Sequence, residues 1–205
     1  MRARTLACLA VLAAHLSLSA PTAARAGGYE DAVLDEINSA RANPQAYARK
    51  LRRMQVQDAS YGDSYGYGGG MAQEDPYAVA DAIDFLMRQR PLPPLQSDRR
   101  LDRAADVHVA RQARSGGEGH GAAGGLGRRL QAEGLFAGMQ AESISYGQDS
   151  PAAVVRQLVI DSRVPSRGHR RDMFSAAWSA AGVGCGPHPR WGAMCVIDYA
   201  GAIQR

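Results

Sequence analysis

The sequence predicts an α+β sandwich in which helices precede strands along the chain. Apolar side chains recur at helical spacing through much of residues 29–161, and two β-like runs, at 181–186 and 193–200, close the chain. The chain has 205 residues, of which 45% are hydrophobic and 21% are charged. This composition suits one globular domain with its own core and excludes both a disordered polyelectrolyte and a membrane protein with several spans.

The first 26 residues have the three-part layout of a secretory signal peptide. Arg2 and Arg4 precede an apolar stretch at about 6–20, and Ala24-Arg25-Ala26 places small residues where a signal peptidase cleaves. The apolar stretch is too short for a comfortable membrane span. We therefore expect residues 1–26 to be removed, leaving one domain over 27–205 that is secreted or periplasmic and has no transmembrane segment. Cys8 raises the alternative of a lipoprotein, but it lies at the start of the apolar stretch, whereas a lipidated cysteine should follow that stretch.

Removal of the signal peptide lowers the net charge and leaves an even number of cysteines. The full chain carries a formal charge of +4, and residues 1–26 contribute three arginines and no acid, so the mature charge is +1. Bulk charge then gives no argument for nucleic acid as a partner. The same cleavage removes Cys8 and leaves Cys185 and Cys195, which we expect to pair as a structural disulfide in an oxidising compartment.

Hydrophobic periodicity, proline and capping residues predict the order of the elements. Asn43-Pro44 should separate a first helix, at 29–42, from a shorter second one, and Ser97 or Asp98 should cap a later helix. Residues 60–71, rich in glycine and tyrosine, should form a surface loop. The remaining expected elements are helices at 76–90, 98–112, 126–133 and 151–161 and an extended segment at 140–146.

Four ionisable residues stand outside the apolar stripes, in glycine-rich or turn contexts: His120, Glu142, Asp161 and His169. Two imidazoles and two carboxylates form a donor set that suits Zn²⁺ or a general acid and base pair. Their spacing matches no local metal motif, so scattered surface residues are the alternative. His108 lies on an apolar helical stripe and is expected to be a core histidine bonded to the backbone.

A basic cluster surrounds His169. We consider Arg167, Arg170 and Arg171, with Arg163 nearby, as candidates for binding a phospholipid head group or an acidic cell-wall polymer. The alternative is that these arginines pair with Asp161 and Asp172 on a solvated face.

Several segments, in order along the chain, resemble the CAP superfamily, also called the SCP domain, of cysteine-rich secretory, antigen 5 and pathogenesis-related proteins. The variant Ile160 to Arg170 resembles a bacterial secreted subgroup. The matching segments are Ile37-Asn38-Ser39-Ala40-Arg41-Ala42-Asn43-Pro44, Ala104-Ala105-Asp106-Val107-His108, Gly119-His120, Ala141-Glu142-Ser143-Ile144-Ser145-Tyr146-Gly147, Gly168-His169-Arg170 and Ala181-Gly182-Val183-Gly184-Cys185-Gly186.

The resemblance implies a three-layer α-β-α sandwich whose central cleft is lined by two histidines and two acids that hold a divalent metal in several members. By motif, His120 and His169 match the two histidines and Glu142 matches the first acid. Asp161 is the candidate for the second acid, where animal and plant members have glutamate. Ser143 stands where the family usually has asparagine.

Two functions remain open from the sequence, besides that of a structural envelope or extracellular protein with a vestigial cleft. The first is a secreted, monomeric binding protein whose cleft holds Zn²⁺ or another divalent cation together with a small lipid, peptide or cell-wall ligand, a class that the resemblance implies. The alternative is a metal-dependent, protease-like hydrolase with Glu142 as general base. The sequence has no His-Glu-x-x-His helix, which favours the binding protein over the enzyme.

Overall fold

The computed structural model describes residues 28–61, 74–122 and 124–203. The signal peptide expected at 1–26 lies outside these ranges, as does most of the Gly/Tyr-rich loop expected at about 60–71. Both therefore stay predictions.

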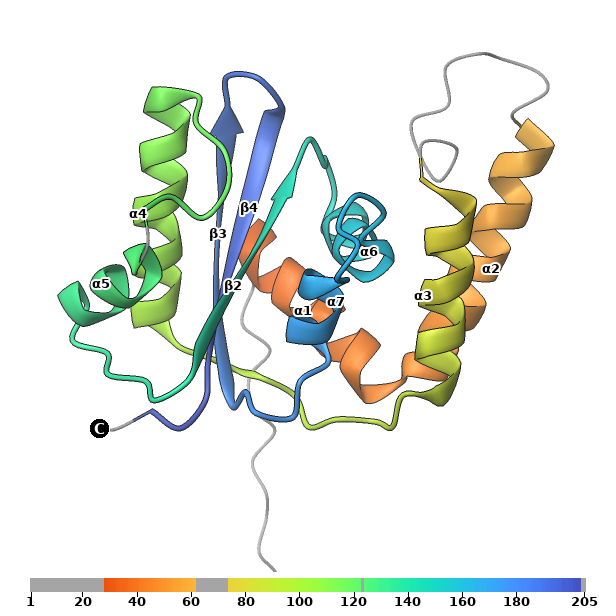
Figure 1. Cartoon of the computed structure of the whole chain (residues 1–205), viewed down its shortest axis with the longest axis horizontal. Coiled ribbons are helices and arrows are strands. Elements are labelled where there is room, and N and C mark those ends of the chain that lie inside the picture. The colour runs from red at the N-terminus through yellow and green to blue at the C-terminus, as the bar shows by residue number, and fades with distance from the viewer. Residues whose placement is uncertain (1–27, 62–73, 123, 204–205) are drawn as a thin grey trace, which may run out of the picture.

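The described chain forms the expected α+β sandwich in three layers (Figure 1). Helices α4 and α5 cover one face of a four-stranded sheet, and α1, α6 and α7 cover the other, with α2 and α3 packed beyond them. In chain order the elements are α1 (Tyr29–Ala42), α2 (Pro44–Tyr61), α3 (Pro76–Arg88), β1 (Gln96–Ser97), α4 (Arg99–Ser115), α5 (Gly125–Ala132), β2 (Gln140–Tyr146), α6 (Pro151–Ile160), α7 (Gly168–Met173), β3 (Ala180–His188) and β4 (Gly192–Ala200).

The strand order is β1-β3-β4-β2, so β2 forms one edge of the sheet. Strands β3 and β4 make the C-terminal antiparallel hairpin that was expected, β2 pairs antiparallel with β4, and β1 adds two residues parallel to β3. Glu142, Asp198 and Gly182 lie side by side in one cross-strand row. Because side chains alternate between the faces of a sheet, Glu142 and Asp198 point toward α4 and α5, and Gly182 turns its open Cα face the same way.

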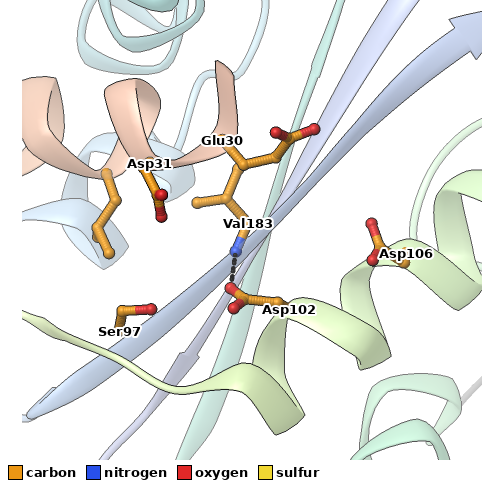
Figure 2. Close-up of a pocket in the computed structure, with 7 residues that line it drawn as sticks. Glu30, Asp31, Ser97, Asp102, Asp106 and Val183 are labelled. Carbon is orange, nitrogen blue, oxygen red and sulfur yellow. Dashed lines mark hydrogen bonds between the residues drawn. The ribbon is translucent and has the colours of Figure 1, made fainter. Parts of the chain in front are cut away.

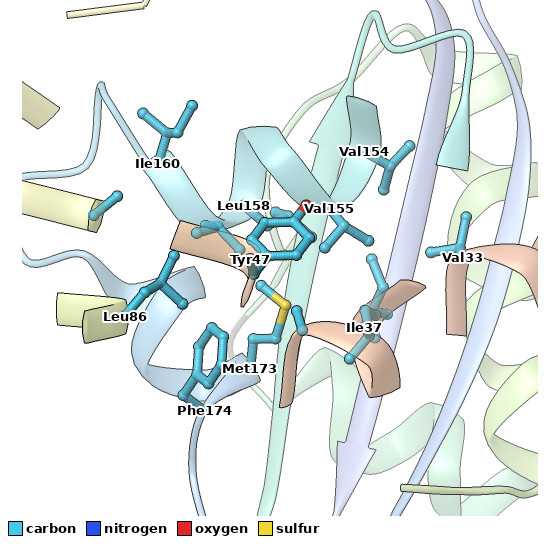
Figure 3. Close-up of a cluster of buried hydrophobic side chains, with 14 of the residues drawn as sticks. Val33, Ile37, Tyr47, Leu86, Val154, Val155, Leu158, Ile160, Met173 and Phe174 are labelled. Carbon is cyan, nitrogen blue, oxygen red and sulfur yellow. The ribbon is translucent and has the colours of Figure 1, made fainter. Parts of the chain in front are cut away.

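The largest apolar core lies on the other face of the sheet, against α1, α3 and α6 (Figure 3). Val33 and Ile37 of α1 and Val155 and Leu158 of α6 are fully buried there. These residues belong to the apolar stripes read from the sequence, so the periodicity predicted both the helices and their buried sides.

Arg41 fastens three segments together on the core side of the molecule. Its guanidinium group is buried and donates hydrogen bonds to the carbonyl oxygens of Pro93 at 3.1 Å, Met173 at 2.6 Å and Ser175 at 3.0 Å. The last two carbonyls belong to the end of α7 and the turn after it, so α1 holds α7 in place directly.

Glycines on β3 allow α4 to lie directly on the sheet. A Cβ atom on Gly182 would overlap the backbone of α4 at Leu101 and Asp102, and one on Gly184 would lie 2.7 Å from the backbone nitrogen of Asp106. The helix therefore sits closer to this strand than any side chain would permit.

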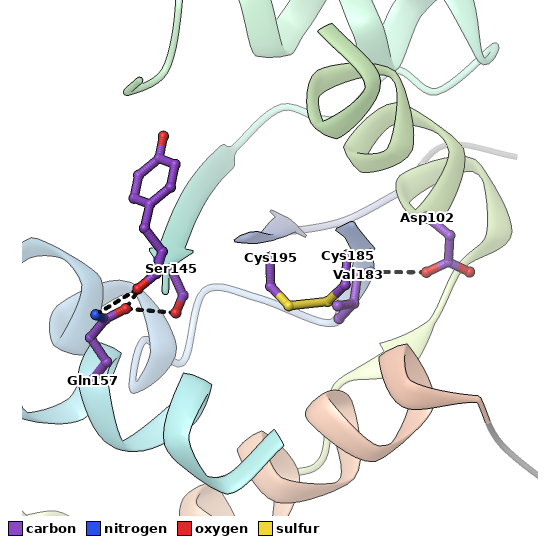
Figure 4. The surroundings of a disulfide bond; sticks show 7 residues. Asp102, Ser145, Gln157, Val183, Cys185 and Cys195 are labelled. Atoms are coloured by element: carbon purple, nitrogen blue, oxygen red, sulfur yellow. Dashed lines mark hydrogen bonds between the residues drawn. A yellow bond between two sulfur atoms is a disulfide. The ribbon is translucent and has the colours of Figure 1, made fainter. Parts of the chain in front are cut away.

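The expected disulfide is present. Cys185 and Cys195 are bonded across directly paired positions of β3 and β4 (Figure 4). The cross-link is local and structural because its cysteines are ten positions apart in a single hairpin.

Three elements differ from the expectation. Helix α2 was expected to be shorter than α1, but it has 18 residues against 14, because good helix formers follow Arg53 without a glycine or proline before Gly62. The short elements β1 and α7 were not foreseen. The cap of α4 is Asp98, whose side chain accepts a hydrogen bond from the Arg100 backbone N–H.

Within the described ranges no helix combines the length and the apolar character needed to span a bilayer.

Replacing Gly182 with alanine should destabilise the protein, because the added methyl group would push α4 away from β3. We expect the free energy of unfolding to fall by roughly 1–3 kcal/mol, the usual cost of overpacking. Chemical denaturation measures this change. The control is Gly138→Ala, at an exposed glycine with no atom near the added Cβ, where the change should stay within about 0.5 kcal/mol. Equal stability of the two variants would contradict the packing argument.

Candidate functional site

The four predicted site residues form two His–carboxylate pairs beside the β2 edge of the sheet. His120 comes from the loop between α4 and α5 and pairs with Glu142 of β2. Asp161 follows the last residue of α6 and pairs with His169 in the first turn of α7. The site thus draws on helices from both faces of the sheet.

In the first pair, Glu142 uses both carboxylate oxygens. Oε1 accepts a hydrogen bond from His120 Nδ1 at 2.8 Å, and Oε2 accepts one from the Arg129 guanidinium group of α5. The Glu142 side chain is only 3% exposed, whereas that of His120 is 58% exposed. Burial alone would raise the pKa of Glu142, but the His120 hydrogen bond and the Arg129 charge outweigh it and lower that pKa. The hydrogen bond to Glu142 in turn raises the pKa of His120.

A second carboxyl group lies behind this pair. Asp198 of β4 is fully buried next to Glu142 in the cross-strand row, and its Oδ1 is 3.6 Å from Arg129 Nη2. Burial and the negative charge of Glu142 raise the pKa of Asp198 well above its ordinary value. Glu142 is therefore the carboxylate that pairs directly with the Arg129 guanidinium group, and Asp198 lies beside this pair.

In the second pair, Asp161 holds both the side chain and the backbone of His169. Oδ1 accepts from His169 Nδ1 at 2.8 Å, and Oδ2 accepts from the His169 backbone N–H at 3.0 Å. Asp161 has a left-handed backbone, with φ of 55°, which ends α6 and turns its carboxylate toward the start of α7. The Asp161 side chain is almost fully buried and the His169 side chain is 23% exposed.

Asp172 of α7 lies near both histidines. Burial raises its pKa, while the positive charges of His169, Arg171 and His120 oppose that rise. The sequence reading did not select Asp172, Arg129 or Asp198 for the site. Asp198 had a detectable signal, because it is a carboxylate inside an otherwise apolar strand.

The structure brings each histidine to one acid, and it does not gather the four side chains as joint ligands. In the described ranges, no group of three or more His, Cys, Asp or Glu side chains is arranged to hold a metal ion. A carboxylate only accepts hydrogen bonds, so Nδ1 of each histidine carries a proton. Nε2, on the other side of each ring, is then the atom that can bind a ligand.

The basic cluster divides into inward and outward side chains. Arg170 is buried and donates to the carbonyl oxygens of α6 at Val159 and Ile160, at 2.7 and 3.0 Å. Arg167 and Arg170 both pair with Asp81 of α3, at 3.2 and 3.1 Å. Arg171 is exposed. Two of the three candidate ligand-binding arginines thus link helices to one another.

His108 is the buried, backbone-bonded histidine that the sequence predicted. Its Nε2 lies 2.9 Å from the carbonyl oxygen of Gly119, which can only accept, so Nε2 carries the proton. Burial lowers the pKa of His108.

A cavity of about 360 Å³ lies away from the two pairs, where β3 runs between α1 and α4 (Figure 2). Asp102 in its wall accepts a hydrogen bond from the Val183 backbone N–H at 3.0 Å. Burial and neighbouring carboxylates raise the pKa of Asp102 and of Asp106. The cavity is lined by Glu30, Asp31, Leu34, Ser97, Asp102, Asp106 and Val183.

Comparison with known proteins identifies a family whose sequence pattern this chain matches. The model described as the cysteine-rich secretory protein family, CAP, matches residues 34–199. No curated protein matches the chain.

Three solved structures are similar at low identity. They are an extracellular protein containing a SCP domain from Bacillus anthracis (20% identity, TM-score 0.47, 64% of this chain and 43% of that one), an outer surface protein from Borrelia burgdorferi (15%, 0.44, 54% and 79%) and a cysteine-rich secretory protein from Staphylococcus aureus (13%, 0.42, 66% and 42%). The chain thus spans less than half the length of the Bacillus and Staphylococcus proteins.

His120 should titrate above the ordinary histidine value of 6.5, because its hydrogen bond to Glu142 stabilises the charged ring. The folded pKa exceeds the unfolded one, so the pair stabilises the protein fully below pH 6.5 and loses this contribution as pH rises through the folded pKa. NMR titration of the His120 ring measures the pKa, and Glu142→Gln should bring it back toward 6.5. A wild-type His120 that titrates at or below 6.5 would show that the pair does not form.

Proposed function

Since this chain belongs to the cysteine-rich secretory protein (CAP) family, we propose that it is a binding protein in which His120 and His169 hold a divalent cation such as Zn²⁺. The observation that carries the proposal is that a carboxylate orients each ring through Nδ1 and leaves Nε2 available. Histidines that bind metals usually donate their other ring N–H to a carboxylate or a carbonyl group.

Of the four predicted ligands, the proposal keeps the two histidines as the groups that bind the metal. Neutral imidazole nitrogen is a good ligand for Zn²⁺, and two such atoms leave coordination positions for water or for a bound ligand. Glu142 and Asp161 then act as the groups that orient the histidines, since their oxygens already accept hydrogen bonds from the rings. A bound cation would supply positive charge that attracts the anionic or carbonyl group of a ligand.

The ligand that we propose is a small lipid, a peptide or a cell-wall fragment. Arg171 and the neighbouring Arg163 are exposed and able to meet an acidic group, whereas Arg167 and Arg170 are engaged with Asp81. The Cys185–Cys195 disulfide supports a secreted or periplasmic location, where disulfides persist. We propose a monomer with no nucleic-acid partner.

The alternative function, a metal-dependent hydrolase, requires Glu142 as a general base. Both Glu142 oxygens are engaged, one by His120 and one by Arg129, and the Arg129 charge helps to lower the Glu142 pKa. A carboxylate held in this way is a poor proton acceptor. The geometry therefore favours the binding protein.

Calorimetric titration with Zn²⁺ at neutral pH tests the proposal. We expect one site, which His120→Ala and His169→Ala each abolish and which weakens on acidification as Nε2 becomes protonated. The control is Tyr77→Phe, at a highly exposed tyrosine of α3 that takes part in neither His–carboxylate pair. This variant should bind as the wild type does.

Unchanged binding in both alanine variants would remove the two histidines as ligands. A chelator-sensitive activity on peptides or cell-wall fragments that Glu142→Gln destroys would favour the hydrolase instead.

A further inference from the structure

The backbone of Gly119, next to His120, is held on both sides by side chains from α4 and β2. The Tyr146 hydroxyl accepts a hydrogen bond from the Gly119 N–H at 2.8 Å. The same hydroxyl donates to Gln112 Oε1 at 2.8 Å, and Gln112 Nε2 donates to the Gly119 carbonyl oxygen at 2.6 Å. Three hydrogen bonds thus close a ring through Tyr146, Gln112 and one peptide unit on each side of Gly119, and His108 Nε2 adds a donor to the same carbonyl at 2.9 Å.

His120 needs such a restraint because glycines flank it. Gly119 and Gly121 have φ values of 74° and 75°, in the left-handed region that glycine enters freely. A loop of this composition has many backbone conformations of similar energy, so local sequence does not fix the direction of the His120 side chain. Only contacts from elsewhere in the fold can select the conformation in which Nδ1 meets Glu142.

Tyr146 is itself rigidly placed. Gln157 of α6 donates to the Tyr146 carbonyl oxygen at 3.1 Å, and its Oε1 accepts from the Tyr146 backbone N–H at 3.2 Å. The Tyr146 ring packs edge-on against His188, with 5.3 Å between the ring centroids, and His188 holds the same loop at the Gly117 carbonyl. Tyr146 thus links the sheet, α6 and the hairpin turn to the loop that carries His120.

We propose that Tyr146 and Gln112 are positioning residues for His120: together they fix the Gly119 backbone so that His120 Nδ1 stays on Glu142 and Nε2 stays turned outward. This inference rests on the proposed function for its purpose, since a fixed Nε2 matters only if it binds a ligand. Tyr146 and Gln112 act on His120 through the Gly119 backbone and need not contact the ligand themselves. Helix α4, strand β2 and the loop between α4 and α5 therefore form one support for the His120 half of the site.

Two variants each remove one part of the support. Tyr146→Phe keeps the ring against His188 but loses both hydroxyl hydrogen bonds. Gln112→Glu keeps an acceptor for Tyr146 but replaces the donor that faces the Gly119 carbonyl. Tyr77→Phe, at a highly exposed tyrosine of α3, is the matched control for the loss of a hydroxyl group.

The readout is the tautomer of the His120 ring in the metal-free protein at pH 8, from long-range ¹H–¹⁵N NMR spectra. The wild type and Tyr77→Phe should show the Nδ1–H form, since Nδ1 donates to Glu142. Tyr146→Phe and Gln112→Glu should shift His120 toward the Nε2–H form and speed hydrogen exchange of the Gly119 amide by about tenfold. His169, held by Asp161, should keep its tautomer in all variants and serves as an internal reference. Zn²⁺ affinity should fall by about tenfold in both variants.

An unchanged His120 tautomer in both folded variants would overturn the positioning role, even if thermal stability fell, because loss of stability alone reflects a structural contact. If one variant fails to fold, the other decides by the same spectrum. If the wild type binds no Zn²⁺, the proposed function fails, and the tautomer shift still decides whether Tyr146 and Gln112 orient His120.

Discussion

The direct contact of α4 with β3 is the constraint on which the rest of the structure depends. Gly182 and Gly184 leave no room for side chains between helix and strand, so the height of α4 above the sheet is set by backbone meeting backbone. From this position α4 offers Gln112 to the loop that carries His120 and the Ala104 carbonyl oxygen to Arg129, at 3.0 Å. His120 and Arg129, the two side chains that bond to Glu142, are thus both placed by α4. That helix is placed in turn by glycines on β3, which β4 separates from β2.

The buried charges around Glu142 follow from the same arrangement. The side chains of Arg129 and Glu142 are equally buried, and that of Asp198 has no exposed surface, so an unbalanced charge at any of them would be costly. The raised pKa of Asp198 disfavours a second negative charge beside the Arg129–Glu142 pair, and His120 meets this pair from the solvent side. One oxygen of Glu142 pairs with the buried Arg129 and the other accepts from the exposed His120 ring, so neither oxygen is left without a partner.

Much of the fold could be predicted from the sequence, because helix faces, caps and the cysteine pair are local or repeated signals. The stripe containing Val33 and Ile37 packs as its spacing indicates, and His108 is the core histidine that was expected. Helix α7 was missed because its six residues are too few to show a periodicity; it is held instead by Arg41 and Asp161. The four candidate site residues were identified individually, but their pairing depends on tertiary placement. The two oxygens of Glu142 accept hydrogen bonds from residues 120 and 129. The spacing of these residues in the sequence does not indicate that they lie close together in space.

The disulfide between β3 and β4 also affects the charged groups of the interior. Cys185 and Cys195 are exact partners in the β3–β4 ladder, and Asp198 lies three residues after Cys195 on the same strand. If β4 slipped by one residue, every side chain on it would change faces, and Asp198 would enter the apolar core beside Ile37 while Ile197 faced Arg129. The covalent bond admits only the register in which the carboxyl group meets the guanidinium group. The disulfide thereby keeps Asp198 next to Arg129 on the opposite face of the sheet.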